Sequence, residues 1–329
     1  MTKLFKILFF LIVMYSCNKD ENTDNKISNN LSVKSSSTFT VVVEQNITYC
    51  QGLKHQTINS ASYSTMDLKL DVYKPVNNAN KRPAILLIHG GGFSGGDKSD
   101  VNIVNLANYF ASRGWVAFSI NYRLQGDKGT IPTQWIQYAQ NNVALIDQSQ
   151  FMAMYPAHRD AKAAIRWLVA NASNYNIDTN YITVGGGSAG AFIAVTLGIT
   201  NSTDFTNEIS LTTDPSLSTT HLNQTYSIKT ILDFWGSGLA VSATNDIYGL
   251  QRFDNSDPPI MIAHGTQDAT VPYTSATELR DIYISTGAKY KLYPLINRGH
   301  AAWDAIVEGK TLEQLSFDFI VEQQKLIVE

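Results

Sequence analysis

The chain has 329 residues, of which 44% are hydrophobic and 16% charged, and this is enough apolar material for a sizeable core in one large domain or two small ones. Its 25 basic and 28 acidic residues give a net charge of −3, and the basic residues form no cluster. Nothing in the charge pattern therefore favours nucleic-acid binding. No run reaches the roughly 18 apolar residues that a bilayer-spanning helix needs.

The amino-terminal end has the pattern of a secretory signal. Lys3 and Lys6 precede a short apolar run, and together they predict a signal peptide over residues 1–16. The small residue before Cys17 resembles the lipobox of bacterial lipoproteins. This resemblance implies that Cys17 is acylated and anchors the chain to outer-membrane lipid. The following Asn18–Glu21 resembles the tag of lipoproteins exposed on the cell surface, and a plain secreted protein is the alternative.

A polar stretch follows the predicted lipidation site. Residues 17–38 are rich in Asn, Asp, Glu, Ser and Thr, so we interpret them as a flexible tether and place a single catalytic domain at residues 39–329. The second of the two cysteines, Cys50, cannot pair with a lipidated Cys17. The sequence around Cys50 shows no supporting site for a nucleophile, so we interpret Cys50 as a packing residue.

From residue 39 onward, predicted strands alternate with predicted helices. The predicted strands are Phe39–Val43, Met66–Tyr73, Ala84–His89, Trp115–Asn121, Tyr181–Gly185, Thr230–Trp235, Ile260–His264 and Lys289–Leu295. The predicted helices are Val101–Ser112, Asp160–Asn171, a segment ending at Ile199, Thr274–Thr286 and Thr311–Gln324. This order predicts an α/β fold with a mostly parallel sheet of about eight strands, helices on both faces, and the first two strands as an antiparallel edge.

Two long segments interrupt the alternation. Leu124–Ala157 and Asn201–Ser227 are long enough to serve as lids or binding loops, with surface decoration as the alternative. The aromatic residues of the first segment could form a platform for a sugar or an aromatic group, or could simply pack. These aromatic residues are Trp135, Tyr138, Phe151 and Tyr155.

Two charged residues beside these segments have structural interpretations. We expect Asp160 to begin its helix, where a carboxylate suits the helix dipole, and Arg123 to form a structural ion pair.

The strongest chemical signal is the glycine-rich segment Gly185–Gly190. It contains Gly-x-Ser-x-Gly around Ser188, between a predicted strand and a predicted helix. A nucleophile on such a tight turn needs small neighbours, and the helix amino terminus favours developing negative charge. Ser188 is therefore the predicted nucleophile.

A second signal is the segment His89–Phe93, which carries three consecutive glycines at the end of an apolar strand. Glycines let backbone N–H groups approach the oxyanion of a tetrahedral intermediate. We predict an oxyanion hole formed by the N–H groups of Gly91, Gly92 and Ala189. His89 precedes the glycines and is expected to orient the loop.

A serine nucleophile needs a base, and the base needs an orienting acid. Among the six histidines, only His300 lies in a loop after the last predicted strand, where it can reach the carboxyl ends of the strands. Asp268 follows the strand Ile260–His264, which gives the order Ser, Asp, His along the chain. Asp233 is the alternative acid.

The remaining histidines have structural interpretations. His264 is expected to be structural, and His55, His158 and His221 are expected to be exposed or capping residues.

These motifs resemble those of bacterial α/β-hydrolase esterases related to hormone-sensitive lipase and to bacterial feruloyl esterases. The resemblance rests on the segments His89–Phe93, Asn121–Arg123, Asp160–Trp167, Gly186–Gly190, His264–Tyr273 and Gly299–His300. It implies the α/β-hydrolase fold and hydrolysis of carboxylic esters without a metal or organic cofactor. The expected partner is a small-molecule or polymer-borne ester, with a short acyl, acetyl or small aryl group, and the polymer-borne ester is inferred from the predicted location alone. In this sequence Gly187 stands where hormone-sensitive-lipase relatives commonly carry Asp or Glu, and Leu124–Ala157 replaces a short stretch containing proline.

Three other functions remain open from the sequence. The same fold serves serine peptidases and amidases or formamidases, and a tethered binding protein without activity is the third alternative. Within esterases, an acetyl or feruloyl esterase acting on polysaccharide and a polyester hydrolase are the substrate alternatives.

Overall fold

The structure is a computed structural model, and it describes residues 31–329. The predicted signal peptide, residues 1–16, and the predicted lipidation site Cys17 lie outside the described residues. None of the helices within residues 31–329 is long and apolar enough to cross a lipid bilayer.

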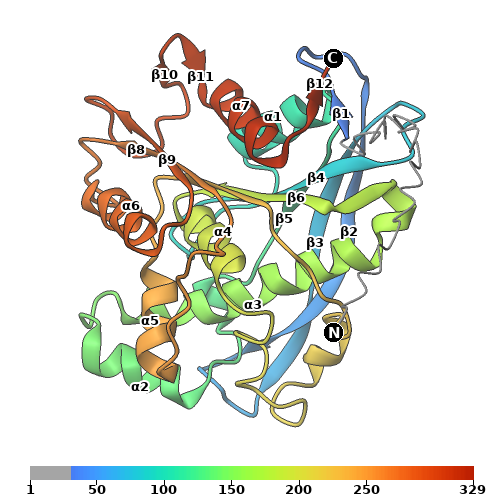
Figure 1. Cartoon of the computed structure of the whole chain (residues 1–329). Helices are drawn as coiled ribbons and strands as arrows, with labels where there is room; N and C mark the ends of the chain where they lie inside the picture. Colours follow the sequence, from blue (N-terminus) through green and yellow to red (C-terminus); the bar gives the residue numbers. More distant parts are fainter. Residues whose placement is uncertain (1–30) are drawn as a thin grey trace, which may run out of the picture.

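One eight-stranded sheet runs through the molecule (Figure 1). Its strands, in spatial order, are β2 (Val41–His55), β3 (Tyr63–Pro75), β5 (Val116–Ile120), β4 (Arg82–Ile88), β6 (Ile177–Gly187), β7 (Thr230–Phe234), β8 (Ile260–Gly265) and β9 (Tyr290–Leu295). The pairs β2–β3 and β3–β5 are antiparallel, and every other pair is parallel. The predicted sheet is confirmed, including its antiparallel edge.

Helices cover both faces of the sheet (Figure 1). They are α1 (Val101–Ala111), α2 (Thr133–Asn142), α3 (Gln148–Ala170), α4 (Ala189–Ile199), α5 (Leu239–Tyr248), α6 (Thr274–Thr286) and α7 (Leu312–Gln324). Helices α1 and α7 pack on one face of the sheet. Helices α3, α4 and α6 pack on the other face, and α2 packs outside α3 and α5. A small hairpin joins β10 (Ile306–Val307) to β11 (Lys310–Thr311).

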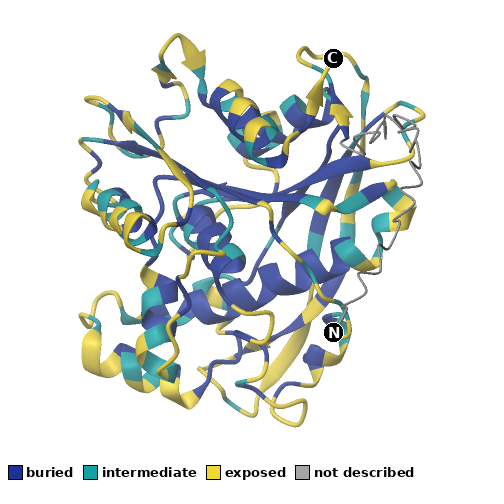
Figure 2. Cartoon of the chain, viewed as in Figure 1, coloured by how far each residue is buried: buried dark blue, intermediate teal, exposed yellow. Residues whose placement is uncertain are grey.

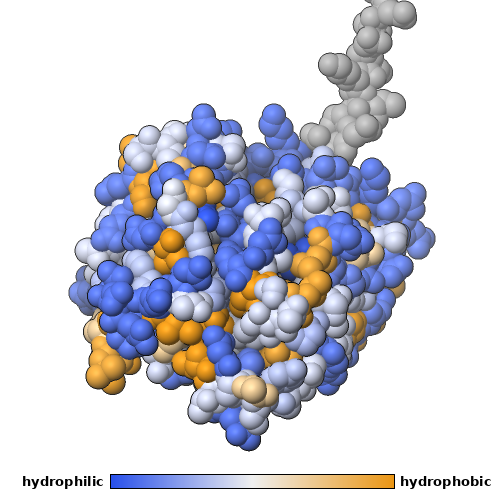
Figure 3. Space-filling view, turned by 90° about the horizontal axis from the view of Figure 1, so that it is seen from below, coloured by the Kyte–Doolittle hydropathy of each residue, from blue (hydrophilic) through white to orange (hydrophobic). Residues whose placement is uncertain are grey.

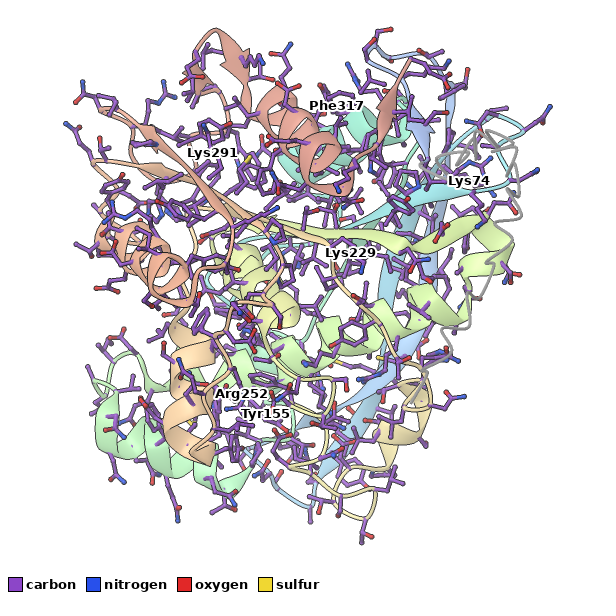
Figure 4. The ribbon with its side chains drawn as sticks, viewed as in Figure 1. Lys74, Tyr155, Lys229, Arg252, Lys291 and Phe317 are labelled. Carbon is purple, nitrogen blue, oxygen red and sulfur yellow. The ribbon has the colours of Figure 1, made fainter. Side chains whose placement is uncertain are left out.

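The sheet separates two hydrophobic clusters. Along β4, Ala84, Leu86 and Ile88 belong to one cluster, whereas Ile85 and Leu87 belong to the other. Every residue of β4 is buried, as expected for a strand covered on both faces. Figure 2 shows the central strands as a buried layer, whereas the edge strands β2 and β9 carry exposed residues. In Figure 4, Phe317 of α7 lies on the opposite side of the sheet from Tyr155 of α3.

The predicted tether is wrong from Leu31 onward. Strand β1 (Ser32–Val33) pairs in parallel with β12 (Ile327–Val328) at the end of the chain. Leu31 and Val33 are 8% and 2% exposed and lie in the cluster with α1 and α7. A few apolar residues in a polar stretch were enough to join the core, because the carboxyl-terminal strand offers them backbone partners. The folded domain therefore includes residues 31–38.

A chain shortened to begin at residue 39 is expected to lose about 3–6 kcal/mol of stability relative to one that begins at residue 31. The shortened chain cannot bury Leu31 and Val33, and each fully buried side chain of this kind contributes about 1.5–3 kcal/mol. Urea denaturation of both chains measures the difference. Equal midpoints would show that the β1–β12 pairing contributes nothing.

The segment Leu124–Ala157 is largely helical. It contains all of α2 and the first ten residues of α3, and the latter helix runs through Pro156 without ending. The sequence indicated a helix only from Asp160, because α3 is buried on nearly all sides and shows no single apolar stripe before that point. The expectation that Asp160 begins a helix is therefore wrong. Asp160 lies inside α3, 2% exposed, and its carboxylate pairs with Arg123 at 2.6 Å.

The second long segment, Asn201–Ser227, is mostly irregular apart from one short 3-10 helix at Pro215–Thr219. Buried polar contacts fix it in place. Asp204 pairs with Arg252 at 2.8 Å, and Asp214 pairs with Arg159 at 2.8 Å. The hydroxyl of Tyr155 donates to Glu208 at 3.0 Å. Tyr155 and Arg252 lie near each other in Figure 4, on the α3 side of the sheet.

Candidate active site

The predicted nucleophile lies on a sharp turn between β6 and α4. Ser188 has φ 53° and ψ −124°, a backbone conformation that costs energy for a residue with a side chain. Its N–H donates to the carbonyl of Phe234, the last residue of β7, at 2.9 Å. A Cβ atom on Gly190 would lie 2.1 Å from the carbonyl oxygen of Ile88, and one on Gly186 would lie 2.5 Å from the same atom. The turn thus requires glycine on both sides of Ser188.

The structure also gives a reason for the unusual Gly187. A Cβ atom at this position would lie 2.8 Å from Cζ2 of Trp303 and 3.3 Å from Nε1 of Trp235. These two indoles are in edge contact, with ring centroids 4.7 Å apart, and Trp235 also lies against the ring of His300 at 6.2 Å. An aromatic pair therefore occupies the space beside the residue that precedes Ser188.

Ser188, His300 and Asp268 form a continuous hydrogen-bonded chain. Nε2 of His300 lies 3.0 Å from Oγ of Ser188, and Nδ1 of the same ring lies 2.8 Å from Oδ2 of Asp268. Asp268 comes from the loop after β8 and His300 from the loop after β9. The side chain of His300 is 22% exposed, whereas that of Asp268 is fully buried. The fold therefore brings together the three residues that were predicted from their order along the chain.

Asp268 is held in position through both of its oxygens. Oδ1 accepts the backbone N–H groups of Thr270 at 2.8 Å and Val271 at 2.9 Å. On the other side, Nε2 of His264 donates to the carbonyl of Val271 at 2.8 Å and lies 3.4 Å from Oδ2 of Asp268. His264 thus has a structural position beneath the acid, and burial lowers its pKa. These contacts fix the carboxylate that faces His300.

The predicted oxyanion hole lies at the carboxyl end of β4, next to Ser188. Gly91 and Gly92 have φ values of 110° and 59°, which glycine adopts without strain. Across the loop, a Cβ atom on Gly90 would lie 3.4 Å from Cβ of Ser188. Among the described residues, the backbone N–H groups of Gly91, Gly92 and Ala189 make no hydrogen bond. They remain available to a ligand beside Ser188.

His89 lies behind this loop. It is 1% exposed, its Nδ1 donates to the carbonyl of Gly90 at 2.7 Å, and its ring stacks on Tyr122 at 4.4 Å. Burial lowers the pKa of His89. The rival acid, Asp233, is also buried and accepts the N–H of Gly236 at 2.7 Å, and burial raises its pKa to about 7. Its hydrogen bond secures the loop after β7 and does not involve His300.

Two of the other sequence interpretations of histidines are wrong. His55 and His158 are buried, at 6% and 2% exposure, although we expected exposed or capping positions. His158 stacks on Phe205 at 5.1 Å, and burial lowers its pKa to about 4. Both became core residues because later segments of the chain cover them. Cys50 is buried as expected.

A cavity of about 510 Å³ opens directly beside Ser188. Its walls come from the oxyanion loop, the segment from α2 to the first turns of α3, the start of α4, the start of α5, and the loop after β8. The lining residues are Gly92, Phe93, Tyr138, Asn142, Val143, Ala144, Asp147, Gln150, Phe151, Met154, Ser188, Ala189, Phe192, Leu239, Thr270 and Val271. Of the four predicted platform aromatics, Tyr138 and Phe151 line the cavity, whereas Trp135 and Tyr155 pack in the core.

Eight of the sixteen lining residues lie in Leu124–Ala157, which the sequence predicted as a lid or binding loop without singling out most of their side chains. Met154 and Phe192 look like ordinary core residues of a helix, and no local motif marks Gln150 or Leu239. Within residues 31–329, no group of three or more His, Cys, Asp or Glu side chains is arranged to hold a metal ion.

Comparison with models of known protein families shows the family of this chain. A family model described as BD-FAE matches residues 70–149 and 136–248, more than half of the chain. The chain belongs to the BD-FAE family. The matched residues include Ser188 and the predicted oxyanion donors, while Asp268 and His300 of this BD-FAE chain lie beyond them.

Curated relatives of this BD-FAE chain are esterases. It is 34% identical over 132 residues to gut esterase 1 of Caenorhabditis elegans, covering 40% of this chain and 21% of the relative. It is 25% identical over 227 residues to esterase LipC of Mycobacterium tuberculosis, covering 63% of this chain and 50% of the relative. The chain thus spans about half or less of the length of these relatives.

Solved structures establish the fold. The propionate-bound thermophilic esterase of Thermogutta terrifontis is 24% identical, covers 78% of this chain and 90% of its own, and has a TM-score of 0.56. A truncated carbohydrate esterase from gut microbiota is 20% identical, with a TM-score of 0.57 and coverage of 89% and 100%. The α/β-hydrolase fold predicted from the sequence is confirmed.

Proposed function

We propose that this BD-FAE protein is a serine hydrolase of carboxylic esters that works through an acyl-enzyme. The observation that carries the proposal is the chain of contacts from Asp268 through His300 to Ser188, at 2.8 and 3.0 Å, beside a cavity of about 510 Å³. Acyl transfer by a serine requires a base within hydrogen-bond distance of the nucleophile and an acid that orients the base. Membership in the BD-FAE family and the esterase names of the relatives support it.

In this mechanism His300 accepts the proton of Ser188 as Oγ attacks the ester carbonyl. Asp268 holds Nδ1 protonated, so that Nε2 is the basic nitrogen. The N–H groups of Gly91, Gly92 and Ala189 stabilise the oxyanion of the tetrahedral intermediate. His300 then gives its proton to the leaving alcohol, and water releases the acid by the same steps.

The cavity favours esters with a short acyl or small aryl group. Its wall is apolar where Phe93, Met154 and Phe192 meet, and polar groups such as Asn142 and Thr270 lie around them. Acetyl or feruloyl esters on a polysaccharide are substrates of suitable size. We further propose that acylation of Cys17 places the enzyme on the outer membrane, facing the medium; a mass spectrum of the amino-terminal peptide without lipid would contradict this.

The test is hydrolysis of p-nitrophenyl esters from acetate to decanoate, together with methyl ferulate, by the purified protein. We expect turnover of the short esters, falling as the acyl chain outgrows the cavity. A folded, monodisperse protein that hydrolyses none of these esters would contradict the proposal. Activity on p-nitroanilide or amide substrates would then identify a peptidase or an amidase.

Gln150 is expected to position the oxyanion loop. Its Nε2 donates to the carbonyl of Gly92 at 2.8 Å, which fixes the peptide between the predicted donors and Phe93. Gln150→Met removes this donor and is expected to lower kcat by about three- to tenfold with little change in KM, because one exposed hydrogen bond contributes about 0.5–1.5 kcal/mol.

The matched variant is Gln150→Glu. Its ionised carboxylate cannot donate and repels the Gly92 carbonyl, whereas its protonated form donates again. The activity of Gln150→Glu relative to the wild type should therefore rise as pH falls from about 6 to about 4, the range in which an exposed glutamate takes up its proton, while the relative activity of Gln150→Met stays flat. Parallel pH profiles for the two variants, or changes in KM alone, would refute this role.

A further inference from the structure

The link between α2 and α3 exposes two adjacent aliphatic side chains. Leu145 and Ile146 are 84% and 87% exposed, the highest values for large apolar side chains within residues 31–329. Single exposed apolar residues are common on protein surfaces, but two neighbours that are both almost fully solvated at one loop tip are not explained by packing.

This loop tip is continuous with the mouth of the candidate active site. The residues on either side of the pair, Asn142–Ala144 and Asp147, line the same cavity as Ser188. Leu239, 50% exposed, lines the cavity from the facing helix α5. Figure 3 views the molecule from the side of α2 and shows apolar side chains at the left of this face, where α2 lies in Figure 1. A ligand resting on the tip would therefore reach the cavity mouth.

The charge around the tip limits what can rest on it. Residues 129–157 contain one charged side chain, Asp147. The preceding Lys128 donates to the carbonyl of Gln56, and on α2 the hydroxyl of Tyr138 donates to Asp246 of α5 at 2.9 Å. An anionic phospholipid surface needs basic residues for attraction and finds none here. A polysaccharide presents hydroxyl groups, against which Leu145 and Ile146 would gain little by leaving water. Two side chains also offer far less than the roughly 1,000 Å² that a stable dimer of a second copy buries.

We propose that Leu145 and Ile146 form a contact tip that seats the enzyme on droplets of neutral, water-insoluble glycerides with short acyl chains. This inference rests on the proposed ester hydrolase activity and names a substrate class for the same site. The aliphatic pair inserts among the acyl chains, and the uncharged surface of α2 lies against the droplet. The cavity mouth then faces the ester groups at the interface, so that substrate enters without crossing bulk water.

The experiment compares one acyl group in two physical forms. Hydrolysis of tributyrin is followed across its solubility limit, and p-nitrophenyl butyrate is measured in true solution. The variant is the double substitution Leu145→Ser and Ile146→Ser. The matched control is Ile296→Ser with Ile306→Ser, which removes two exposed isoleucines, at 67% and 60% exposure, that do not line the cavity.

We expect the wild-type rate to rise steeply once tributyrin forms an emulsion. The Leu145/Ile146 variant should lose about fivefold or more of its emulsion rate, because it no longer buries this apolar surface, while its rate on dissolved p-nitrophenyl butyrate stays within about twofold. The control should match the wild type on both substrates. In addition, inactive Ser188→Ala protein should float with glyceride droplets, and adding the two serine substitutions should abolish flotation.

Several results would overturn the inference. One is an equal loss on both substrates, and another is no loss on either. A third is a wild-type rate that rises on polyester particles but not on tributyrin emulsions. A fourth is light scattering that shows a dimer for the wild type and a monomer for the Leu145/Ile146 variant. If the wild type fails to hydrolyse dissolved p-nitrophenyl butyrate, the proposed function itself has failed, and flotation of the Ser188→Ala protein still reports on the contact tip separately.

Discussion

Ser188→Ala is expected to lower kcat/KM for p-nitrophenyl acetate by about 10⁴- to 10⁶-fold. The substitution removes the oxygen that lies 3.0 Å from Nε2 of His300, so no acyl-enzyme can form. The remaining groups, the N–H donors and the cavity, still bind the ester and give only a small residual rate. Steady-state hydrolysis of the purified variant measures the loss, and an organophosphate that labels the wild type should leave the variant unmodified.

The control for this substitution is Ser285→Ala. Ser285 lies on α6, away from the cavity, and within residues 31–329 its hydroxyl bonds only to the carbonyl of Ile282 in the same helix. We expect this variant to keep wild-type activity. If Ser188→Ala kept more than about a tenth of the wild-type rate, another residue would have to be the nucleophile.

Asp160→Ala is expected to lower the free energy of unfolding by about 3–5 kcal/mol. The carboxylate of Asp160 accepts the guanidinium of Arg123 at 2.6 Å and its backbone N–H at 2.8 Å, and both side chains are almost fully buried. Removing one partner leaves the other charge inside the protein without compensation. Urea denaturation, followed by tryptophan fluorescence, measures the change.

A surface ion pair provides the comparison. Asp318 pairs with Lys310 at 2.6 Å, and both side chains are about half exposed, so Asp318→Ala should cost less than about 1 kcal/mol. The double variant Arg123→Met with Asp160→Leu should recover much of the stability that Asp160→Ala loses, because it leaves no unpaired charge. A cost below about 1 kcal/mol for Asp160→Ala would show that water reaches Arg123.

The local elements of the fold could be predicted from the sequence because their signals are local. Continuous apolar runs such as Ala84–His89 predicted strands buried on both faces, and this strand forms within a few residues of its expected bounds. The first strand, predicted as Phe39–Val43, instead runs from Val41 to His55. The glycines around Ser188 predicted the tight turn after β6, because no larger residue fits against the carbonyl of Ile88. The long helix α3 was only half predicted, since burial on nearly all sides removes the periodic pattern.

The residues of the candidate site were predicted from their order along the chain, because the sequence does not show which side chains touch. Asp268 and His300 each follow a strand, and the carboxyl ends of parallel strands meet at one edge of the sheet. In the structure, His300 lies within hydrogen-bond distance of both Asp268 and Ser188. Their catalytic roles stay predictions until the variants are measured.

By itself, the sequence determined the alternation of strands and helices, the glycine turns and the short list of chemically competent residues, because each depends on a few neighbours along the chain. Only the tertiary structure decided which distant residues meet. Pairing with β12 drew Leu31 and Val33 into the core, and later segments buried His55 and His158. The walls of the cavity come from five separate parts of the chain. Long-range contacts of this kind depend on how whole layers pack, and no short segment carries that information.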